Sequence, residues 1–255
     1  MGRLRELCKE FRVGNLQDLT SEVAFNDPDQ YLTDLLELAL KKRRSRKADR
    51  LIKQAGFPVA KTLEDYDFSP VTFPESIDEE SLTSLDFIEN KENVLMVGSV
   101  GTGKTHLATA LGIKACMQGK RVSFYRAGEL TNKLLEKHED GEEKKLMKKI
   151  EKADLFILDE LGYIPFTKKG SQLLFSVITK SYEHQSIIVT SNLEFGRWNE
   201  VFGDEHLTAA LLDRVIHHGH ILSFSGESFR FKEAMANRKR ESKEDFKLTN
   251  NELTS

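Results

Sequence analysis

Apolar residues in the first sixty positions recur at the spacing of a helix. After a turn signal at residues 26–28, the pattern runs from 32 to 40 and resumes from 51 to 55, until Gly56 and Pro58 end it. We therefore expect one long helix, with shorter helices before it at residues 4–19. Residues 1–60 are predicted to form a small helical module.

Beyond this module, short apolar runs alternate with helical stretches. Prolines at 58, 70 and 74 indicate a linker over residues 57–80. The predicted strands cover residues 94–97, 122–125, 155–158, 187–190 and 220–224. Two helical stretches, 128–138 and 142–152, lie between the second and third runs, with a break at Gly141. This alternation predicts an α/β domain over residues 61–240, with a parallel five-stranded sheet and helices on both faces. Residues 241–255 are polar and are expected to be a disordered tail.

A glycine-rich segment directly follows the first predicted strand and precedes a helix at 106–117. Its sequence GSVGTGKT, residues 98–105, fits the phosphate-binding pattern GxxxxGK[ST]. Glycines allow backbone N–H groups to point inward, and the helix N-terminus favours an anion. We expect Lys104 to reach the β and γ phosphates of ATP and the Thr105 hydroxyl to ligate Mg²⁺. The expected nucleotide-binding residues are Gly98, Ser99, Val100, Gly101, Thr102, Gly103, Lys104, Thr105 and His106.

Two later strands end in polar side chains. The run at 155–158 ends in Asp159 and Glu160, and the run at 187–190 leads to Asn192. Because ligands of open α/β sheets bind at the carboxyl ends of strands, Asp159 is predicted to face the Mg²⁺ of Thr105. Glu160 is predicted to polarise a water for attack on the γ phosphate, and Asn192 to hydrogen-bond that water or the phosphate. The alternatives are an acidic turn after a strand and an ordinary strand-end asparagine.

Charge is unevenly distributed in a chain of 255 residues whose net charge is −3. The long predicted helix has eight basic residues against Asp49 alone between 41 and 53, and this basic stripe comprises Lys41, Lys42, Arg43, Arg44, Arg46, Lys47, Arg50 and Lys53. Such density predicts binding to the phosphates of double-stranded DNA, although a solvated helix face is the alternative. No signal region and no apolar stretch of bilayer length occurs, so we expect no membrane contact and a cytoplasmic location.

The motifs carry a resemblance to known families. GSVGTGKTHLA, ILDELGY, IVTSN and the segment 212–215, in this order, resemble an AAA+ ATPase of the initiator and helicase-loader branch. The basic helical start, followed by residues 56–58, then TLEDYDF at 62–68 and the segment 228–230, is similar to the IstB family.

The resemblance implies a bacterial insertion-sequence helper. Such a protein would hydrolyse ATP, assemble with itself on target DNA and present that DNA to an IstA-type transposase. By position, Arg214 resembles the arginine finger that completes a neighbouring subunit's site, and Arg230 resembles a sensor arginine that touches the phosphates. A surface charge paired with Asp213 is the alternative for Arg214.

Other enzymes with a phosphate loop fit less well. A GTPase needs the guanine-binding motif NKxD, whereas Asn132-Lys133 is followed here by two leucines. In a DExH helicase the acidic strand would continue as DExH, whereas here it continues as Asp-Glu-Leu-Gly. A small-molecule kinase is the remote alternative, because it would not need a glutamate placed to activate water. A DnaC-like replicative helicase loader remains the nearest alternative, and a protein that uses ATP only as a structural switch is another.

Overall fold

A twisted sheet forms the centre of the molecule. The computed structural model describes residues 6, 8, 13, 16–25, 27–64, 66–226, 228 and 229. The strands lie in the order β1-β6-β2-β5-β4-β3; β1 is antiparallel to β6 and all other neighbours are parallel. Their bounds are β1 Val71–Thr72, β2 Asn93–Gly98, β3 Val122–Arg126, β4 Leu155–Leu161, β5 Ser186–Ser191 and β6 Gly219–Phe224.

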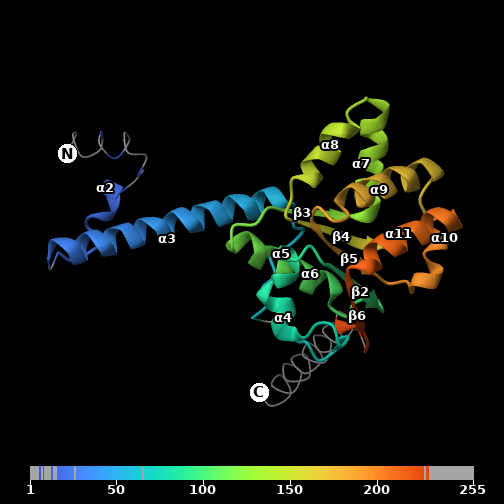
Figure 1. The fold of residues 1–255 in the computed structure, drawn as a ribbon, viewed down its shortest axis with the longest axis horizontal. Helices are drawn as coiled ribbons and strands as arrows, with labels where there is room; N and C mark the ends of the chain where they lie inside the picture. The colour runs from blue at the N-terminus through green and yellow to red at the C-terminus, as the bar shows by residue number, and fades with distance from the viewer. Residues whose placement is uncertain are drawn as a thin grey trace, which may run out of the picture.

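Helices cover both faces of this sheet (Figure 1). The bounds are α2 Leu16–Leu19, α3 Pro28–Ala55, α4 Glu79–Ser84, α5 Asp86–Glu89, α6 Lys104–Met117, α7 Ala127–Glu139, α8 Glu143–Glu151, α9 Lys168–Ser181, the 3-10 turn η1 Phe195–Arg197, α10 Asn199–Phe202 and α11 Glu205–His217. One core contains α4, α5, α6 and the end of α3, and the other contains α7 to α11. Among the described helices, none is both long and apolar enough to cross a membrane.

Strand burial explains why the apolar runs were continuous. Along β2, Val94 and Met96 belong to the first core and Leu95 to the second; all three are fully buried. Successive side chains of a strand point to opposite faces, so a strand covered on both faces is apolar throughout. The five predicted strands and the alternating helices are confirmed. The sixth strand, β1, was not predicted because it has only two residues.

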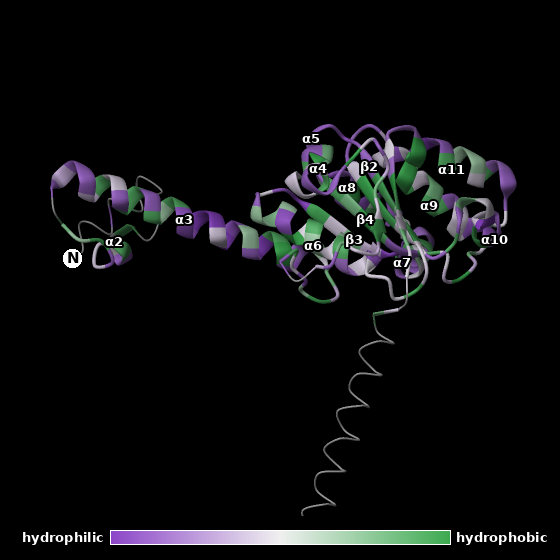
Figure 2. Cartoon of the chain, turned by 90° about the horizontal axis from the view of Figure 1, so that it is seen from below, coloured by the Kyte–Doolittle hydropathy of each residue, from purple (hydrophilic) through white to green (hydrophobic). Residues whose placement is uncertain are grey.

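Helix α3 is a single element of 28 residues. The Asp27 side chain caps its start by accepting hydrogen bonds from the N–H groups of Asp29 and Gln30, at 3.0 and 3.2 Å. Gly56 ends it in the left-handed conformation, with φ 86°. Leu51 and Ala55 are buried in the first core, whereas the rest of the helix projects away from the domain (Figures 1 and 2). The predicted long helix is therefore confirmed and is anchored at one end.

The segment 57–70, which the prolines marked as a linker, packs against α6 instead. Phe57, Leu63, Tyr66 and Phe68 are half-buried against the first core. The prolines exclude regular structure, but these apolar side chains still bury surface. We call residues 57–70 the strap. Several expected features lie outside the described residues. Among them are the helical positions Leu4, Leu7 and Phe11 of the segment 4–19, the tail 241–255 and Arg230.

Candidate nucleotide site

The phosphate loop joins β2 to α6 and depends on its glycines. Gly98, Gly101 and Gly103 have φ values of 149°, 80° and 97°, which side-chain-bearing residues rarely adopt. A Cβ on Gly98 would lie 2.0 Å from the Phe224 carbonyl oxygen, and one on Gly101 would lie 2.1 Å from Ser228 Oγ. The loop is therefore held tightly against the end of β6 and the segment that follows it.

Lys104 begins α6, and its side chain folds back over the loop. Its Nζ donates hydrogen bonds to the carbonyl oxygens of Gly98 and Ser99, at 2.7 and 2.6 Å. Burial lowers the pKa of Lys104 to about 8, and the charge of Asp159 opposes part of that change. The ammonium thus lies inside the loop. Its predicted reach to the β and γ phosphates stays a prediction.

Asp159 and Thr105 meet as the sequence predicted. Thr105 Oγ1 donates to Asp159 Oδ1 at 2.8 Å, and Thr190 Oγ1 donates to the same oxygen at 2.6 Å. Asp159 is fully buried, and its Oδ2 has no hydrogen-bond partner among the described residues. A buried carboxylate oxygen without a partner is costly unless it binds a ligand or ion. Thr190, which the sequence analysis did not single out, orients this carboxylate.

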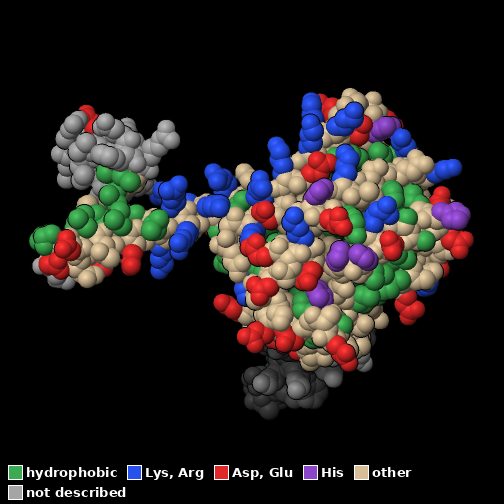
Figure 3. All heavy atoms as spheres, viewed as in Figure 1, with side chains coloured by type: hydrophobic (Ala, Val, Ile, Leu, Met, Phe, Trp, Pro, Cys, Tyr) green, Lys and Arg blue, Asp and Glu red, His purple; other side chains and the backbone are tan. Residues whose placement is uncertain are grey.

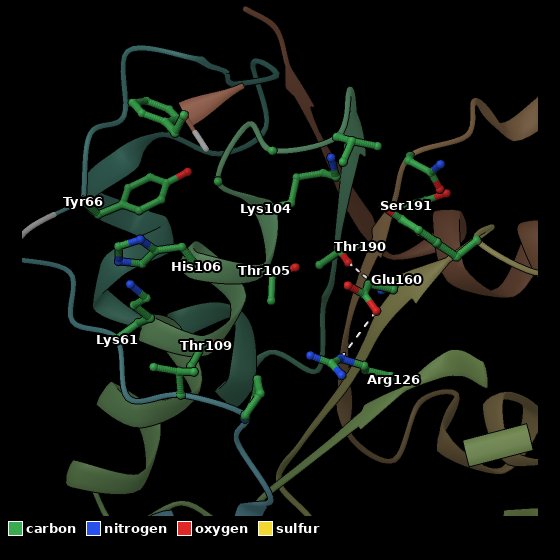
Figure 4. Close-up of a pocket in the computed structure, with 18 of the residues that line it drawn as sticks. Lys61, Tyr66, Lys104, Thr105, His106, Thr109, Arg126, Glu160, Thr190 and Ser191 are labelled. Atoms are coloured by element: carbon green, nitrogen blue, oxygen red, sulfur yellow. Dashed lines mark hydrogen bonds and ion pairs between the residues drawn. The ribbon is translucent and has the colours of Figure 1, made fainter. Parts of the chain in front are cut away.

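Glu160 lies next to Asp159 but on a strained backbone. Its φ of 58° is unusual for a residue other than glycine, and its N–H donates to Thr190 Oγ1 at 3.0 Å. The carboxylate faces the cavity and forms an ion pair with Arg126, with 3.4 Å between Glu160 Oε2 and Arg126 Nε (Figure 4). Arg126, at the end of β3, also contacts Glu129 at 3.3 Å. No motif marked Arg126 in the sequence.

These side chains surround one cavity of about 420 Å³, a size typical of small-molecule sites. Glu160, Thr190, Ser191, Asn192 and Arg126 line the side formed by the strand ends. Asn192 Oδ1 is buried without a hydrogen-bond partner among the described residues. The sheet thus brings the predicted Asn192 and Glu160 together with Lys104 and Thr105.

The opposite side of the cavity comes from α6 and the strap, which the sequence analysis treated as a linker. Its residues are Pro58, Val59, Lys61, Tyr66, Asp67, His106 and Thr109. His106 Nε2 lies 3.2 Å from the Thr62 carbonyl oxygen, so it fixes the strap to α6. His106 was among the expected nucleotide-binding residues; for the strap, the available signals were the TLEDYDF segment of the family resemblance and the density of aromatic side chains in a proline-rich segment.

Of the two candidate arginines, the structure describes only Arg214, which lies away from the cavity. Arg214 is on α11; its Nη1 donates to the Ala210 carbonyl oxygen at 2.6 Å, and its guanidinium lies 5.2 Å from the centre of the Phe175 ring. It does not line the cavity, and within the described part of the chain it forms no ion pair with Asp213. Arg230 is not among the described residues. The arginine-finger and sensor roles stay predictions.

The basic stripe begins on the projecting part of α3 and runs into its anchored end, where Lys53 lies between the core residues Leu51 and Ala55. Seven of its eight side chains are exposed, and the eighth, Lys42, pairs with Glu22. Figure 3 shows Lys and Arg side chains gathered where α3 leaves the domain. Arg43, Arg46, Lys47 and Arg50 recur at helical spacing and so share one face of the helix.

Comparison with known proteins identifies relatives. Residues 5–237 match the family model described as IstB-like ATP binding protein. The chain is 40% identical over 236 residues to the ATP-binding protein of insertion sequence IS21 from Pseudomonas aeruginosa, covering 91% of this chain and 88% of that one. It is 39% identical over 207 residues to the corresponding IS5376 protein from Geobacillus stearothermophilus, covering 80% and 81%.

Solved structures show the same fold at lower identity. The DnaC helicase loader superposes with a TM-score of 0.51 at 23% identity, over 64% of this chain and 96% of that chain. AMPPCP-bound DnaA from Aquifex aeolicus superposes with a TM-score of 0.54 at 21% identity, over 72% and 56%. At such identities the likeness concerns the AAA+ architecture alone.

Proposed function

The chain belongs to the family of IstB-like ATP binding proteins, and from this premise we propose that it is a Mg²⁺-dependent ATPase that assembles on double-stranded DNA as a transposition helper. The observation that carries the catalytic part is the contact between Thr105 and Asp159 beside the phosphate loop. The second carboxylate oxygen of Asp159 has no partner in the described part of the chain. Relatives that share most of the chain are named as insertion-sequence ATP-binding proteins.

The residues present fit a magnesium ion with ATP. Carboxylate and hydroxyl oxygens are the ligands that Mg²⁺ prefers, and phosphates and waters commonly complete its shell. Mg²⁺ held by Thr105 and Asp159 would neutralise charge on the phosphate oxygens. When ATP binds, the Lys104 ammonium would give up its hydrogen bonds to the loop carbonyl oxygens and donate to phosphate oxygens instead.

On the strand-end side, Glu160 accepts a proton from the attacking water, and Asn192 orients that water or the γ phosphate. Arg126 holds the Glu160 carboxylate in place through the ion pair. A glutamate poised beside the phosphate loop favours hydrolysis over phosphoryl transfer to a small-molecule acceptor.

The projecting helix supplies the DNA contact. Exposed basic side chains on α3 would neutralise DNA phosphates and release counterions, which gives binding without sequence preference. Arg214 does not line its own subunit's cavity; if it is the arginine finger that the resemblance implies, a second copy would supply it and hydrolysis would depend on assembly. From the resemblance to the IstB family, we propose an IstA-type transposase as the partner and the bacterial cytoplasm as the location; the names of the relatives support the link to insertion sequences. The DnaC likeness supports only the fold.

ATP turnover measured with and without double-stranded DNA, over a range of protein concentrations, tests the proposal. We expect turnover to require Mg²⁺, to rise per subunit with concentration and to increase with DNA. Turnover that is absent under all these conditions, although ATP is bound, would reduce the protein to a nucleotide-dependent switch. Transfer of phosphate to an added small acceptor would favour a kinase.

A further inference from the structure

Tyr66 places a buried hydroxyl against the phosphate loop. Its ring meets Phe68 and His106 edge to face, with centroid distances of 4.7 and 5.1 Å. The hydroxyl oxygen is inaccessible to solvent and has no hydrogen-bond partner among the described residues. Burial raises the pKa of Tyr66, so the hydroxyl keeps its proton and is a donor at any physiological pH.

The Tyr66 hydroxyl has a defined orientation relative to the phosphate loop. Figure 4 shows that it points from the strap towards the phosphate loop. A Cβ built on Gly103, the residue that precedes α6, would lie only 3.1 Å from the hydroxyl oxygen. Tyr66 also lines the cavity that contains Lys104 and Thr105. The donor is therefore buried, without a partner, and at the edge of a site for a phosphorylated ligand.

Position in the cavity indicates which part of the ligand it would meet. Tyr66 and His106 lie on one side of Lys104 and Thr105, whereas Glu160, Thr190 and Arg126 lie on the other (Figure 4). The γ phosphate belongs beside Glu160 if that residue activates water. The Tyr66 side is therefore the side of the nucleoside and the α phosphate, which ATP and ADP share.

We propose that Tyr66 is a nucleotide-binding residue whose hydroxyl donates a hydrogen bond to the part of the nucleotide common to ATP and ADP. This inference rests on the proposed nucleotide site. A buried polar group without a partner is unfavourable, and a ligand oxygen that accepts its hydrogen bond removes that penalty on binding. The aromatic contacts with Phe68 and His106 hold the donor in place before the ligand arrives, so little side-chain entropy is lost.

Tyr66→Phe is the direct test, because it removes the hydroxyl and keeps the ring. Dissociation constants for ATP and ADP are measured by calorimetry without turnover, and Tm is measured for the nucleotide-free protein. Loss of one neutral hydrogen bond predicts affinities for both nucleotides weaker by the same factor, about 2- to 10-fold. The nucleotide-free variant should be at least as thermally stable as wild type, because the hydroxyl has no partner to lose among the residues that the structure describes.

Tyr182→Phe is the matched control. The Tyr182 hydroxyl lies 3.1 Å from His217 Nδ1 and outside the cavity, so its removal should leave both affinities unchanged. Wild-type affinity in Tyr66→Phe would overturn the inference, as would a lower Tm of its nucleotide-free form or an equal loss in Tyr182→Phe. A loss confined to ATP would overturn the assignment to the shared part of the nucleotide. Wild-type protein that binds no nucleotide would overturn the proposed function and the inference with it, whereas binding unaffected by Tyr66→Phe overturns the inference alone.

Discussion

At the scale of single residues, Lys104 links nucleotide affinity to pH. Its pKa is lowered to about 8 in the free protein, so a growing fraction of the ammonium is neutral above that pH. A phosphate favours the charged form, and binding above pH 8 must therefore take up a proton. We expect ATP affinity to fall above pH 8 by up to roughly tenfold per pH unit, and to level off below it. Dissociation constants measured between pH 7 and 9.5 test this; in Lys104→Arg, whose side chain stays charged, affinity should change less over the same range.

The two central side chains should separate binding from hydrolysis. Lys104→Ala removes the charge that is proposed to hold the phosphates and should abolish ATP retention. Glu160→Gln preserves the shape of the side chain but removes the base, so ATP should stay bound without being hydrolysed. Filter binding and phosphate release measure the two effects. If both variants lost ATP binding equally, the separate roles of Lys104 and Glu160 would be wrong.

Which site residues the sequence could predict depends on whether a local pattern marks them. Thr105 and Asp159 each belong to a motif that follows a strand, and the parallel sheet brings strand ends together, so their contact was predictable. Arg126 belongs to no motif, and Tyr66 lies in the TLEDYDF segment, which carried the family resemblance but gave no sign of a place beside the nucleotide. Arg126 lies beside the cavity because β3 is the neighbour of β4 in the sheet, and Tyr66 lies there because of the path of the strap. Both are tertiary properties.

At the scale of elements, α3 can be tested as a DNA-binding helix. Replacing Lys42, Arg43, Arg46 and Lys47 by Ala removes up to four phosphate contacts, so the slope of log affinity against log salt should flatten by up to about 4 units. Binding should weaken uniformly across DNA sequences, while ATP affinity of the free protein stays unchanged. Fluorescence anisotropy with unrelated duplexes at several salt concentrations measures both quantities.

A second variant makes this test specific to α3. Replacing Lys144, Lys145, Lys148 and Lys149 on α8, which are exposed, removes the same charge from another surface. A larger loss in the α3 variant supports contact through the projecting helix. If the α3 variant kept wild-type DNA affinity and salt slope, its basic residues would form only a solvent-exposed helix face that does not bind DNA.

The elements themselves were predictable where burial left a periodic signal. Strands buried on both faces gave continuous apolar runs, and α3 had both a capping aspartate and a terminal glycine. The strap had no periodicity, because its aromatic side chains bury against α6 from an irregular backbone. Sequence patterns report regular elements and miss irregular segments that pack equally well.

At the scale of the whole molecule, the arginine-finger role that the resemblance implies for Arg214 predicts that hydrolysis depends on assembly. Arg214→Ala should lower turnover by roughly 10³- to 10⁵-fold if the guanidinium stabilises the transferring phosphoryl group, while ATP binding persists. Mixing Arg214→Ala with Lys104→Ala should restore part of the activity, because one subunit keeps an intact pocket and the other an intact arginine. Arg197→Ala, which removes a surface arginine paired with Glu200, is the control and should remain active. A mixture that stays inactive would contradict action between subunits.

The anchoring of α3 also has a mechanical consequence. A continuous helix of 28 residues is about 42 Å long, and it is stiff because each turn is hydrogen-bonded to the next. Its base packs against α6, the helix that starts with Lys104 at the phosphate loop. A force on the projecting part of α3 would therefore be transmitted to α6. A tilt of about 5° at the base would move the far end by roughly 4 Å. If DNA binds the stripe, which lies closer to the base, a force on it would bear on the helix that begins at the phosphate loop.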